Sequence, residues 1–460
     1  MRLSVLLVII VALIAVIGVV VVGGALVAPE QPLIITASVM PATITPNADG
    51  IDDVTIFTYS LARNATISIA LESETGDVFT FRHDERRPAN TYYVGFSGVV
   101  DGYLRQGETV AGEVMRRLMP DGRYTWRLTA TDDAGAREEV TSTLTIQDGD
   151  APLPEITEFT VFPDVFTPNQ DGISDRTAIN VYLTKPSELT VTLQQDNIEP
   201  IVLAQRFQDA RPGESGRYLY DYEGGVDLGA EPPPDGDYVV VAEAQDAVGQ
   251  RVRRTVTLTI QDGGKPLAEI VPQPTGATVM FETQSYDDRY AAARGVEGER
   301  IAPPDAPASL SMNAITMPVG DLLVFKLTIE NYSGVPIRTT GPAPGTVYDW
   351  EQRASTLGWF DESGAWRVGI DCTTAASDYP WRWSLGDADT LQTALDPVSG
   401  DPYLYLPAGE RAVVWGAIRM SDIETRNPQN CWAGLIHEDV EVSNRNNNIG
   451  ARQVELVAAS

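Results

Sequence analysis

Apolar and polar residues alternate along much of this chain, and this alternation predicts β-strands. The pattern is plain in segments 55–61, 66–71, 125–130 and 140–146, where apolar side chains recur at every second position. Successive side chains of a strand point to opposite faces, so each segment buries one face and exposes the other. The Pro-Asp-Gly sequence at 120–122 favours a tight turn between two of these strands.

A nine-residue phrase occurs twice in the chain. The sequence T-P-N-A-D-G-I-D-D at 45–53 returns as T-P-N-Q-D-G-I-S-D at 167–175, and the alternating segments that follow also match at an offset of 122. The Pro-Asp-Gly turn returns at 234–236, at an offset of 114, so the second copy is shorter by eight residues before this turn. A duplication of this length indicates a duplicated domain.

The amino-terminal segment predicts a membrane anchor. Residues 3–28 carry no charge, and a helix of this length reaches about 39 Å, enough to cross a bilayer. The apolar stretch is longer than that of a cleaved signal peptide. Arg2 places the amino terminus in the cytoplasm. We therefore expect residues 1–29 to be a transmembrane anchor (or an uncleaved signal) of a single-pass cell-membrane protein whose bulk is extracytoplasmic.

Three further parts follow the anchor. The first repeat spans 33–149, the second repeat spans 155–263, and a distal domain spans 267–460. Short proline-bearing joints connect them, which predicts a semi-rigid rod. The distal domain contains seven of the eight tryptophans, and its residues 283–310 are polar and predict an insertion or loop.

The repeats resemble a known family. The phrase T-P-N-x-D-G-x-x-D, the alternating strands, and the later P-D-G-x-Y and D-x-x-G turns are similar to the Ig-like repeat of the flagellar hook-capping protein, over about 230 residues. The distal domain is similar, over about 100 residues, to the bacterial intracellular proteinase-inhibitor family, another Ig-like fold; its insertion at 357–374 and its cysteine pair depart from that family. The resemblances imply an all-β chain of tandem Ig-like β-sandwich domains after one N-terminal transmembrane helix.

Composition and charge limit the classes of function that the chain is expected to have. The net charge is -31, from 64 acidic and 33 basic residues, which repels phosphate backbones and excludes nucleic acid as the expected partner. The two histidines leave little room for a His-based zinc site or a catalytic triad. The sequence also contains no Gly-x-Ser-x-Gly, phosphate-binding glycine loop or Cys-x-x-Cys. We therefore expect a protein that is not an enzyme.

The two copied loops have the residue types of a calcium site. Calcium prefers six to eight oxygen ligands that converge on a tight turn. The same residues also form metal-free Asx-turns, and the loops lack the bidentate glutamate of an EF-hand, so both interpretations stay open. The candidate ligands are Asn47, Asp49, Asp53, Asn169, Asp171 and Asp175.

Two residue pairs in the distal domain suggest further features. Cys372 and Cys431 are an even pair in an exported chain, which favours one disulfide over two separate buried thiols. Trp381 and Trp383 are two residues apart, so on a strand they share one face. That face is either an aromatic platform for a ligand or part of the core.

His437 precedes two acidic residues, but no second histidine follows at metal-binding spacing, so we expect a structural role.

The order of anchor, repeats and a differently composed end predicts the function. We expect a membrane-anchored extracytoplasmic structural and binding protein, in which the repeats are a stalk that presents the distal domain to an envelope protein or polysaccharide. One alternative is a protease inhibitor displayed at the cell surface, which the distal resemblance implies. Another is a glycan-binding envelope protein, which the tryptophans suggest.

Overall fold

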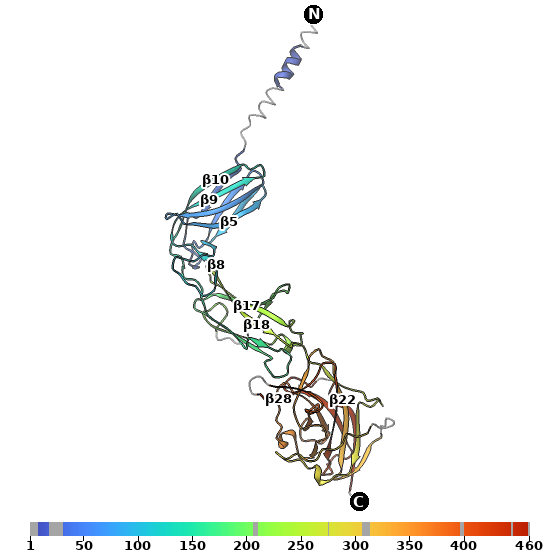
Figure 1. Ribbon diagram of the computed structural model, residues 1–460. Helices are drawn as coiled ribbons and strands as arrows, with labels where there is room; N and C mark the ends of the chain where they lie inside the picture. Colours follow the sequence, from blue (N-terminus) through green and yellow to red (C-terminus); the bar gives the residue numbers. More distant parts are fainter. Residues whose placement is uncertain are drawn as a thin grey trace.

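The computed structural model describes residues 8–17, 31–205, 210–274, 276–305, 313–395, 400–442 and 445–458. In these residues the regular structure after the amino-terminal segment consists of strands and short 3-10 turns, so the all-β prediction is confirmed. Figure 1 shows an elongated chain, with the amino terminus at one end, the two repeats in the middle and the distal domain at the other end.

The predicted anchor is only partly described. Residues 8–17 form a helix whose apolar side chains are exposed; the rest of the predicted anchor, 1–7 and 18–29, lies outside the described residues. No helix in the described part is long and apolar enough to cross a membrane. The transmembrane anchor stays a prediction.

The first repeat is a sandwich of two sheets, with strand orders β1-β3-β6 and β2-β10-β9-β4-β5. Alternation produces this packing: in 55–61, every second residue is buried between the sheets. Its strands are β1 (Ile34–Met40), β2 (Thr43–Ile44), β3 (Thr55–Leu61), β4 (Ala65–Ser73), β5 (Val78–Arg87), β6 (Thr91–Phe96), β7 (Val99–Asp101), β8 (Glu113–Leu118), β9 (Gly122–Asp132) and β10 (Arg137–Ile146).

The second repeat forms the same sandwich around its own apolar core. The duplication extends to single hydrogen bonds: the buried hydroxyls of Thr55 and Thr177 donate to the carbonyls of Pro41 and Pro163, at 2.6 and 2.7 Å. Its elements are β11 (Ile156–Phe162), β12 (Val165–Phe166), β13 (Thr177–Leu183), β14 (Glu188–Gln194), β15 (Ile201–Val202), β16 (Gly216–Tyr222), η1 (Val226–Leu228), β17 (Gly236–Gln245) and β18 (Arg251–Ile260).

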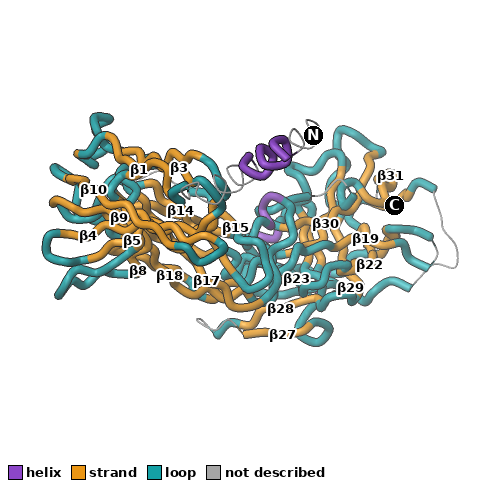
Figure 2. Tube along the Cα trace, turned by 90° about the horizontal axis from the view of Figure 1, so that it is seen from above, coloured by secondary structure: helices purple, strands orange, loops and turns teal. Residues whose placement is uncertain are grey.

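The two copies differ where the first has extra residues. Segment 97–121 of the first repeat is longer than its counterpart 223–235, and the extra length forms the β7–β8 hairpin. Strand β8 pairs antiparallel with β18 of the second repeat, so one sheet, β15-β14-β17-β18-β8-β7, runs through both repeats. Figure 2 shows β8 beside β18. A shared sheet restrains bending between the repeats, because bending would break its backbone hydrogen bonds.

Gln250 closes this joint from inside. Its side chain is fully buried. Its oxygen accepts the backbone N–H of Leu118 at 3.2 Å, and its amide nitrogen donates to the carbonyls of Asp150 and Pro152 at 3.0 and 2.9 Å. One side chain thus binds the first repeat, the linker and the second repeat.

The distal domain is a larger sandwich with its own core. Its two sheets have strand orders β19-β22-β29-β24 and β21-β31-β30-β25-β23-β28-β27, with β20 paired to β22 and β26 paired to β25. Its elements are β19 (Ala268–Val271), β20 (Val279–Gln284), η2 (Asp288–Tyr290), β21 (Ile315–Pro318), β22 (Leu322–Asn331), β23 (Ile337–Thr339), β24 (Val347–Asp349), η3 (Ala354–Leu357), β25 (Trp366–Cys372), β26 (Trp381–Trp383), β27 (Gln392–Leu395), β28 (Pro402–Leu406), β29 (Arg411–Arg419), β30 (Gln429–His437) and β31 (Ile449–Val457).

The predicted disulfide is confirmed. Cys372 at the end of β25 and Cys431 in β30 are directly opposite each other in the antiparallel pair and are bonded. The bond joins two strands of the larger sheet across 59 residues of sequence. It therefore closes a long loop and restricts the unfolded chain.

Replacing Gln250 with alanine is expected to loosen the joint between the repeats. The groups that it pairs would lose their partners in a buried position, at a cost of about 1–3 kcal/mol for each. Small-angle scattering on the full chain should then show a broader distribution of interatomic distances. The control is Gln261→Ala, an exposed glutamine of the same repeat. An unchanged distribution in Gln250→Ala would mean that strand pairing alone fixes the joint.

Candidate functional site

The two copied loops, 45–53 and 167–175, are held by their own side chains. In the first loop, the Asp53 carboxylate accepts the backbone N–H of Asn47, Ala48 and Gly50, at 3.0, 2.7 and 2.7 Å. Asn47 and Asp49 each accept the N–H two residues further on, at 3.0 and 2.8 Å. These are Asx-turns.

The second loop repeats this arrangement. Asp175 accepts the N–H of Asn169, Asp171 and Gly172, at 3.3, 3.2 and 2.6 Å. Asn169 and Asp171 again accept from the residues two positions on. The copied polar residues therefore build the loop backbone in both repeats.

All six candidate calcium ligands already accept hydrogen bonds within their own loops. Several oxygens of the six candidate ligands face N–H donors, which carry the same sign of partial charge as a cation. No group of three or more His, Cys, Asp or Glu side chains that could hold a metal occurs among the residues that the structure describes. Calcium binding stays a prediction, and the Asx-turn accounts for the copied residues.

The two loops differ in what covers them. Residues 47–52 of the first loop are exposed, and the side chain of Ile51 is 67% exposed. In the second loop, Asn169 and Asp171 are buried. Asn169 donates to the Asp262 carbonyl of its own repeat at 3.3 Å, and Asp171 contacts the distal domain. We call residues 167–175 the docking loop.

Three side chains of the distal domain bind the docking loop. Arg338 Nε donates to the carbonyl of Asp171 at 2.6 Å, and the Tyr405 hydroxyl donates to its carboxylate at 3.0 Å. His437 Nε2 donates to the carbonyl of Gln170 at 2.7 Å. These contacts recognise both backbone and side chain. With Ser363 and Gly364, the three residues form what we call the socket.

Glycines permit a close backbone contact at the centre of the joint. A Cβ atom on Gly172 would lie 2.0 Å from the carbonyl oxygen of Ser363, and one on Gly364 would lie 2.2 Å from the backbone of Asp171 and Gly172. Both glycines also have positive φ, of 84° and 79°. Any side chain at either position would push the docking loop out of the socket.

The socket wall is held by buried arginines. Arg338 also donates to the Ser363 carbonyl at 2.7 Å and pairs with Glu362 at 2.9 Å. Behind it, the fully buried Arg367 donates to the Phe360 carbonyl at 2.6 Å and pairs with Glu438 at 3.3 Å. The loop that carries Gly364 is thus fixed from both sides.

Burial changes the pKa values of three ionisable groups where the docking loop meets the socket. It lowers the pKa of His437 to about 4, so the ring is neutral at pH 7 and Nε2 is its donor toward Gln170. Burial also raises the pKa of Asp171. Burial, followed by repulsion from Asp171, raises the pKa of Asp175 to about 6. His437 stacks on Trp366 with ring centroids 4.3 Å apart, which places it against the sandwich core.

Trp381 and Trp383 are core residues, which corrects the alternative of an aromatic platform and agrees with the other interpretation that the sequence left open. Their side chains are 1% and 0% exposed. The Trp383 ring packs on Phe325 and Tyr348, and its indole N–H donates to the Thr346 carbonyl at 3.0 Å. Alternation correctly places the two rings on one face, but that face of β26 is turned into the sandwich.

The Asp-x-x-Gly turns lie at the opposite end of each sandwich from the copied loops. Asp132 accepts from Arg63 at 2.6 Å, and the matching Asp246 accepts from Lys185 at 2.6 Å. Each turn lies just before the first residue of β10 or β18. The carboxyl ends of these two strands pair with β2 and β12, which lie beside the copied loops, so the turns and the loops are at opposite ends. The repeats therefore follow each other head to tail.

Sequence reasoning missed the residues that make the joints. Gln250, Arg338 and Tyr405 lie in no recognisable motif, and for His437 a structural role was expected but its partner, Gln170, was not identified. One signal was present: aligning the copies places Gln250 opposite Ala136, directly after the shared Asp-x-x-Gly turn. A large polar residue in one copy and a small one in the other indicates a contact that only one copy makes.

Comparisons with known proteins give no family. No protein-family model and no curated protein matches the chain. Among solved structures, a calcium-stabilised adhesin with which an Antarctic bacterium binds ice is 14% identical, covering 92% of this chain and 75% of that chain, with a TM-score of 0.21. Two fibronectin type III domains of chicken tenascin are 12% identical, covering 49% of this chain and 97% of that chain, with a TM-score of 0.16. Superpositions this poor leave the function to be argued from the contacts above.

Replacing Asp53 with alanine is expected to loosen the first loop without involving calcium. Three N–H groups lose their acceptor. Because the loop is exposed, water partly replaces that acceptor, so the cost is about 1–2 kcal/mol. Amide hydrogen exchange of Ala48 and Gly50 should accelerate equally in calcium and in chelator. The control is Asp52→Ser, which copies residue 174 of the second repeat. If chelation of the wild type reproduced the effect of Asp53→Ala, calcium would be the organising ligand.

His437 is expected to make the distal domain less stable in acid. The folded-state pKa of His437, about 4, lies below the ordinary value of 6.5. The contribution of the neutral ring to the free energy of unfolding is therefore complete above pH 6.5, and about 3 kcal/mol of it is lost as the pH falls toward 4. The raised pKa values of Asp171 and Asp175 act in the opposite direction, but they are shared by wild type and variant.

The measurement is tryptophan-detected denaturation, which reports the distal domain because seven of the eight tryptophans lie there. The stability advantage of wild type over His437→Gln should shrink between pH 6.5 and 4. His83→Gln, at an exposed histidine, is the control and should show no such change. A pH-independent difference for His437→Gln would show that the buried ring does not titrate in this range.

Proposed function

We propose that this protein is a membrane-anchored, extracytoplasmic stalk whose two repeats hold the distal domain away from the membrane for binding, without catalysis. The observation that supports this most is that both joints are closed by specific contacts. A strand of the first repeat is part of the sheet of the second repeat, and a loop of the second repeat is buried in the distal domain.

Such joints oppose the usual mobility of linked domains. Domains joined by small polar contacts move relative to each other by default. Here, opening the second joint would expose or leave unpaired Asp171, Arg338 and His437, which are 6%, 4% and 3% exposed. Each buried polar group left without a partner costs about 1–3 kcal/mol. Stiffness along the chain is the property that a stalk requires.

Charge and redox chemistry also fit an exterior location. A disulfide persists in oxidising compartments, and the bond between Cys372 and Cys431 is formed. The net charge of -31 keeps an extended chain soluble. The described apolar helix, residues 8–17, lies at the end farthest from the distal domain, which suits an anchor there.

Fractionation of cells that express the full chain tests this proposal. The chain is expected in the membrane fraction, resistant to alkaline extraction, with the cysteine pair oxidised. Protease added outside spheroplasts should degrade the repeats and the distal domain. The control is a chain without residues 1–30, which should leave the membrane fraction. Recovery of the full chain from the cytosol, with reduced cysteines, would contradict the proposal.

Glycan binding by the distal domain is a second candidate. It loses the support of Trp381 and Trp383, which are buried. It gains support from another tryptophan, Trp359, which lines a pocket of the same domain.

A further inference from the structure

The distal domain has a pocket of about 440 Å³ that none of the contacts above uses. Its lining comes from segment 290–300, from segment 342–347 and from 357–359, at the end of η3. The first of these segments is part of the polar insertion in the sequence. Pockets that bind small ligands have volumes of about 300–1,000 Å³, so this one has room for a small ring compound.

Backbone hydrogen bonds fix the shape of the pocket wall. Ala293 and Val296 exchange N–H···O bonds of 2.9 and 2.8 Å, so residues 293–296 form a tight hairpin. Gly298 lies so close to Tyr290 that a Cβ on it would be 2.3 Å from the Tyr290 carbonyl oxygen. The wall is therefore preformed, which lowers the entropic cost of binding.

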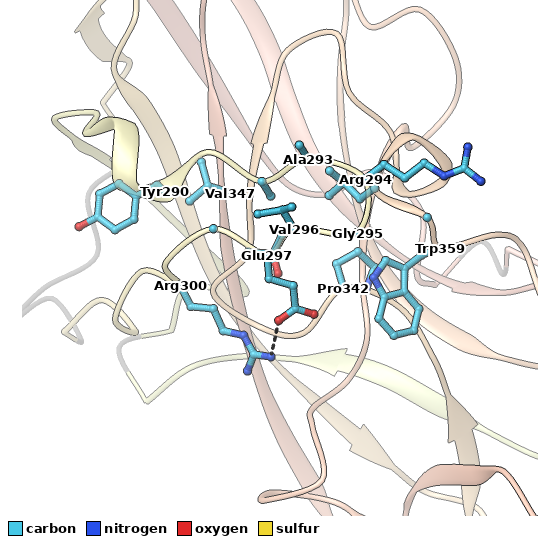
Figure 3. A pocket seen from close by; sticks show the side chains of 15 residues that line it. Tyr290, Ala293, Arg294, Gly295, Val296, Glu297, Arg300, Pro342, Val347 and Trp359 are labelled. Carbon is cyan, nitrogen blue, oxygen red and sulfur yellow. Dashed lines mark ion pairs between the residues drawn. The ribbon is translucent and has the colours of Figure 1, made fainter.

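The pocket combines an apolar base with one half-buried aromatic ring. Tyr290, Ala292 and Val347 line it and are buried. Figure 3 shows the Trp359 ring beside Pro342 on one side of the pocket and Tyr290 on the other side. Trp359 is half-buried. Its indole N–H has no hydrogen-bond partner in the described part of the chain and is available to a ligand.

Two arginines line the pocket, and one of them lacks an ion-pair partner among the described residues. Arg294, at the hairpin tip, is exposed and has no ion-pair partner among the described residues. Arg300 is held by Asp387 at 3.0 Å and by Glu297 at 3.7 Å, and Figure 3 shows the second of these pairs. A guanidinium has five N–H donors, so Arg300 keeps donors for a ligand. In a chain with nearly twice as many acidic as basic residues, the Arg294 guanidinium at this pocket favours an anionic group.

We propose that this pocket binds an anionic saccharide, a pyranose unit that carries a carboxylate within an extracellular polysaccharide. The apolar face of the sugar ring packs on Trp359. The carboxylate pairs with Arg294, because guanidinium and carboxylate form two parallel hydrogen bonds. Glu297 accepts from the sugar hydroxyl groups. This inference rests on the proposed function, since it names what the presented domain recognises.

The probe is a trimer of galacturonic acid, with a trimer of galactose as its neutral counterpart. We expect the full chain to bind the acidic trimer at least about tenfold more tightly by calorimetry. Binding should change tryptophan fluorescence and weaken as salt is added, because exposed charge pairs are screened.

Three variants and two controls locate the binding. Trp359→Ala should weaken binding about tenfold or more, and Trp359→Phe should keep part of the affinity while abolishing the fluorescence change. Arg294→Gln should remove the preference for the acidic trimer. The controls are Trp432→Phe, at another half-buried tryptophan, and Arg353→Gln, at an exposed arginine outside the pocket. Both should bind as the wild type does.

Three results would overturn the inference. They are no binding of the acidic trimer by a folded chain, equal affinity for the neutral trimer, or full affinity in both Trp359→Ala and Arg294→Gln. Unchanged denaturation curves of the variants show that they are folded. If the chain fractionates with the membrane but does not bind the trimer, the proposed stalk function stands and the proposed ligand is refuted. If the chain is cytosolic and binds the trimer, the stalk function is refuted and the proposed ligand stands.

Discussion

The close contact between the docking loop and the socket determines how the protein is built. Two backbones meet where neither Gly172 nor Gly364 has room for a side chain, and buried polar groups around them are paired across the joint. Such a contact is stable only in one relative orientation, because any shift leaves buried donors or acceptors unpaired. The position of the distal domain, and with it the exposure of its pocket, follows from this constraint.

Duplication followed by divergence at the ends explains how one loop has two roles. Both copies are built by the same Asx-turns, so the loop is rigid before it contacts anything. In the first repeat it stays exposed, and the extra β7–β8 hairpin makes the joint instead. In the second repeat the hairpin is absent and the loop is the contact. The sandwich cores need not change for either joint to form.

Much of the fold was predictable because it depends on local sequence. Alternation located the strands and the duplicated turns, and the cysteine count indicated the disulfide between Cys372 and Cys431. The joints were not predictable, since Gln250 and Arg338 contact residues far away in the sequence. The sequence left open whether Trp381 and Trp383 form a platform or part of the core, because alternation shows which residues share a face but not whether that face is covered. Trp359 has no pattern of its own and is identified only by the pocket around it.

Rigidity between the second repeat and the distal domain is the central claim, and a distance distribution measures it directly. Spin labels on cysteines introduced at Thr190 and Gln453, both exposed, report the separation of the two parts by pulsed electron paramagnetic resonance. The account predicts one narrow distribution that is the same at low and high salt. A broad distribution, or several separations that change with salt, would contradict it.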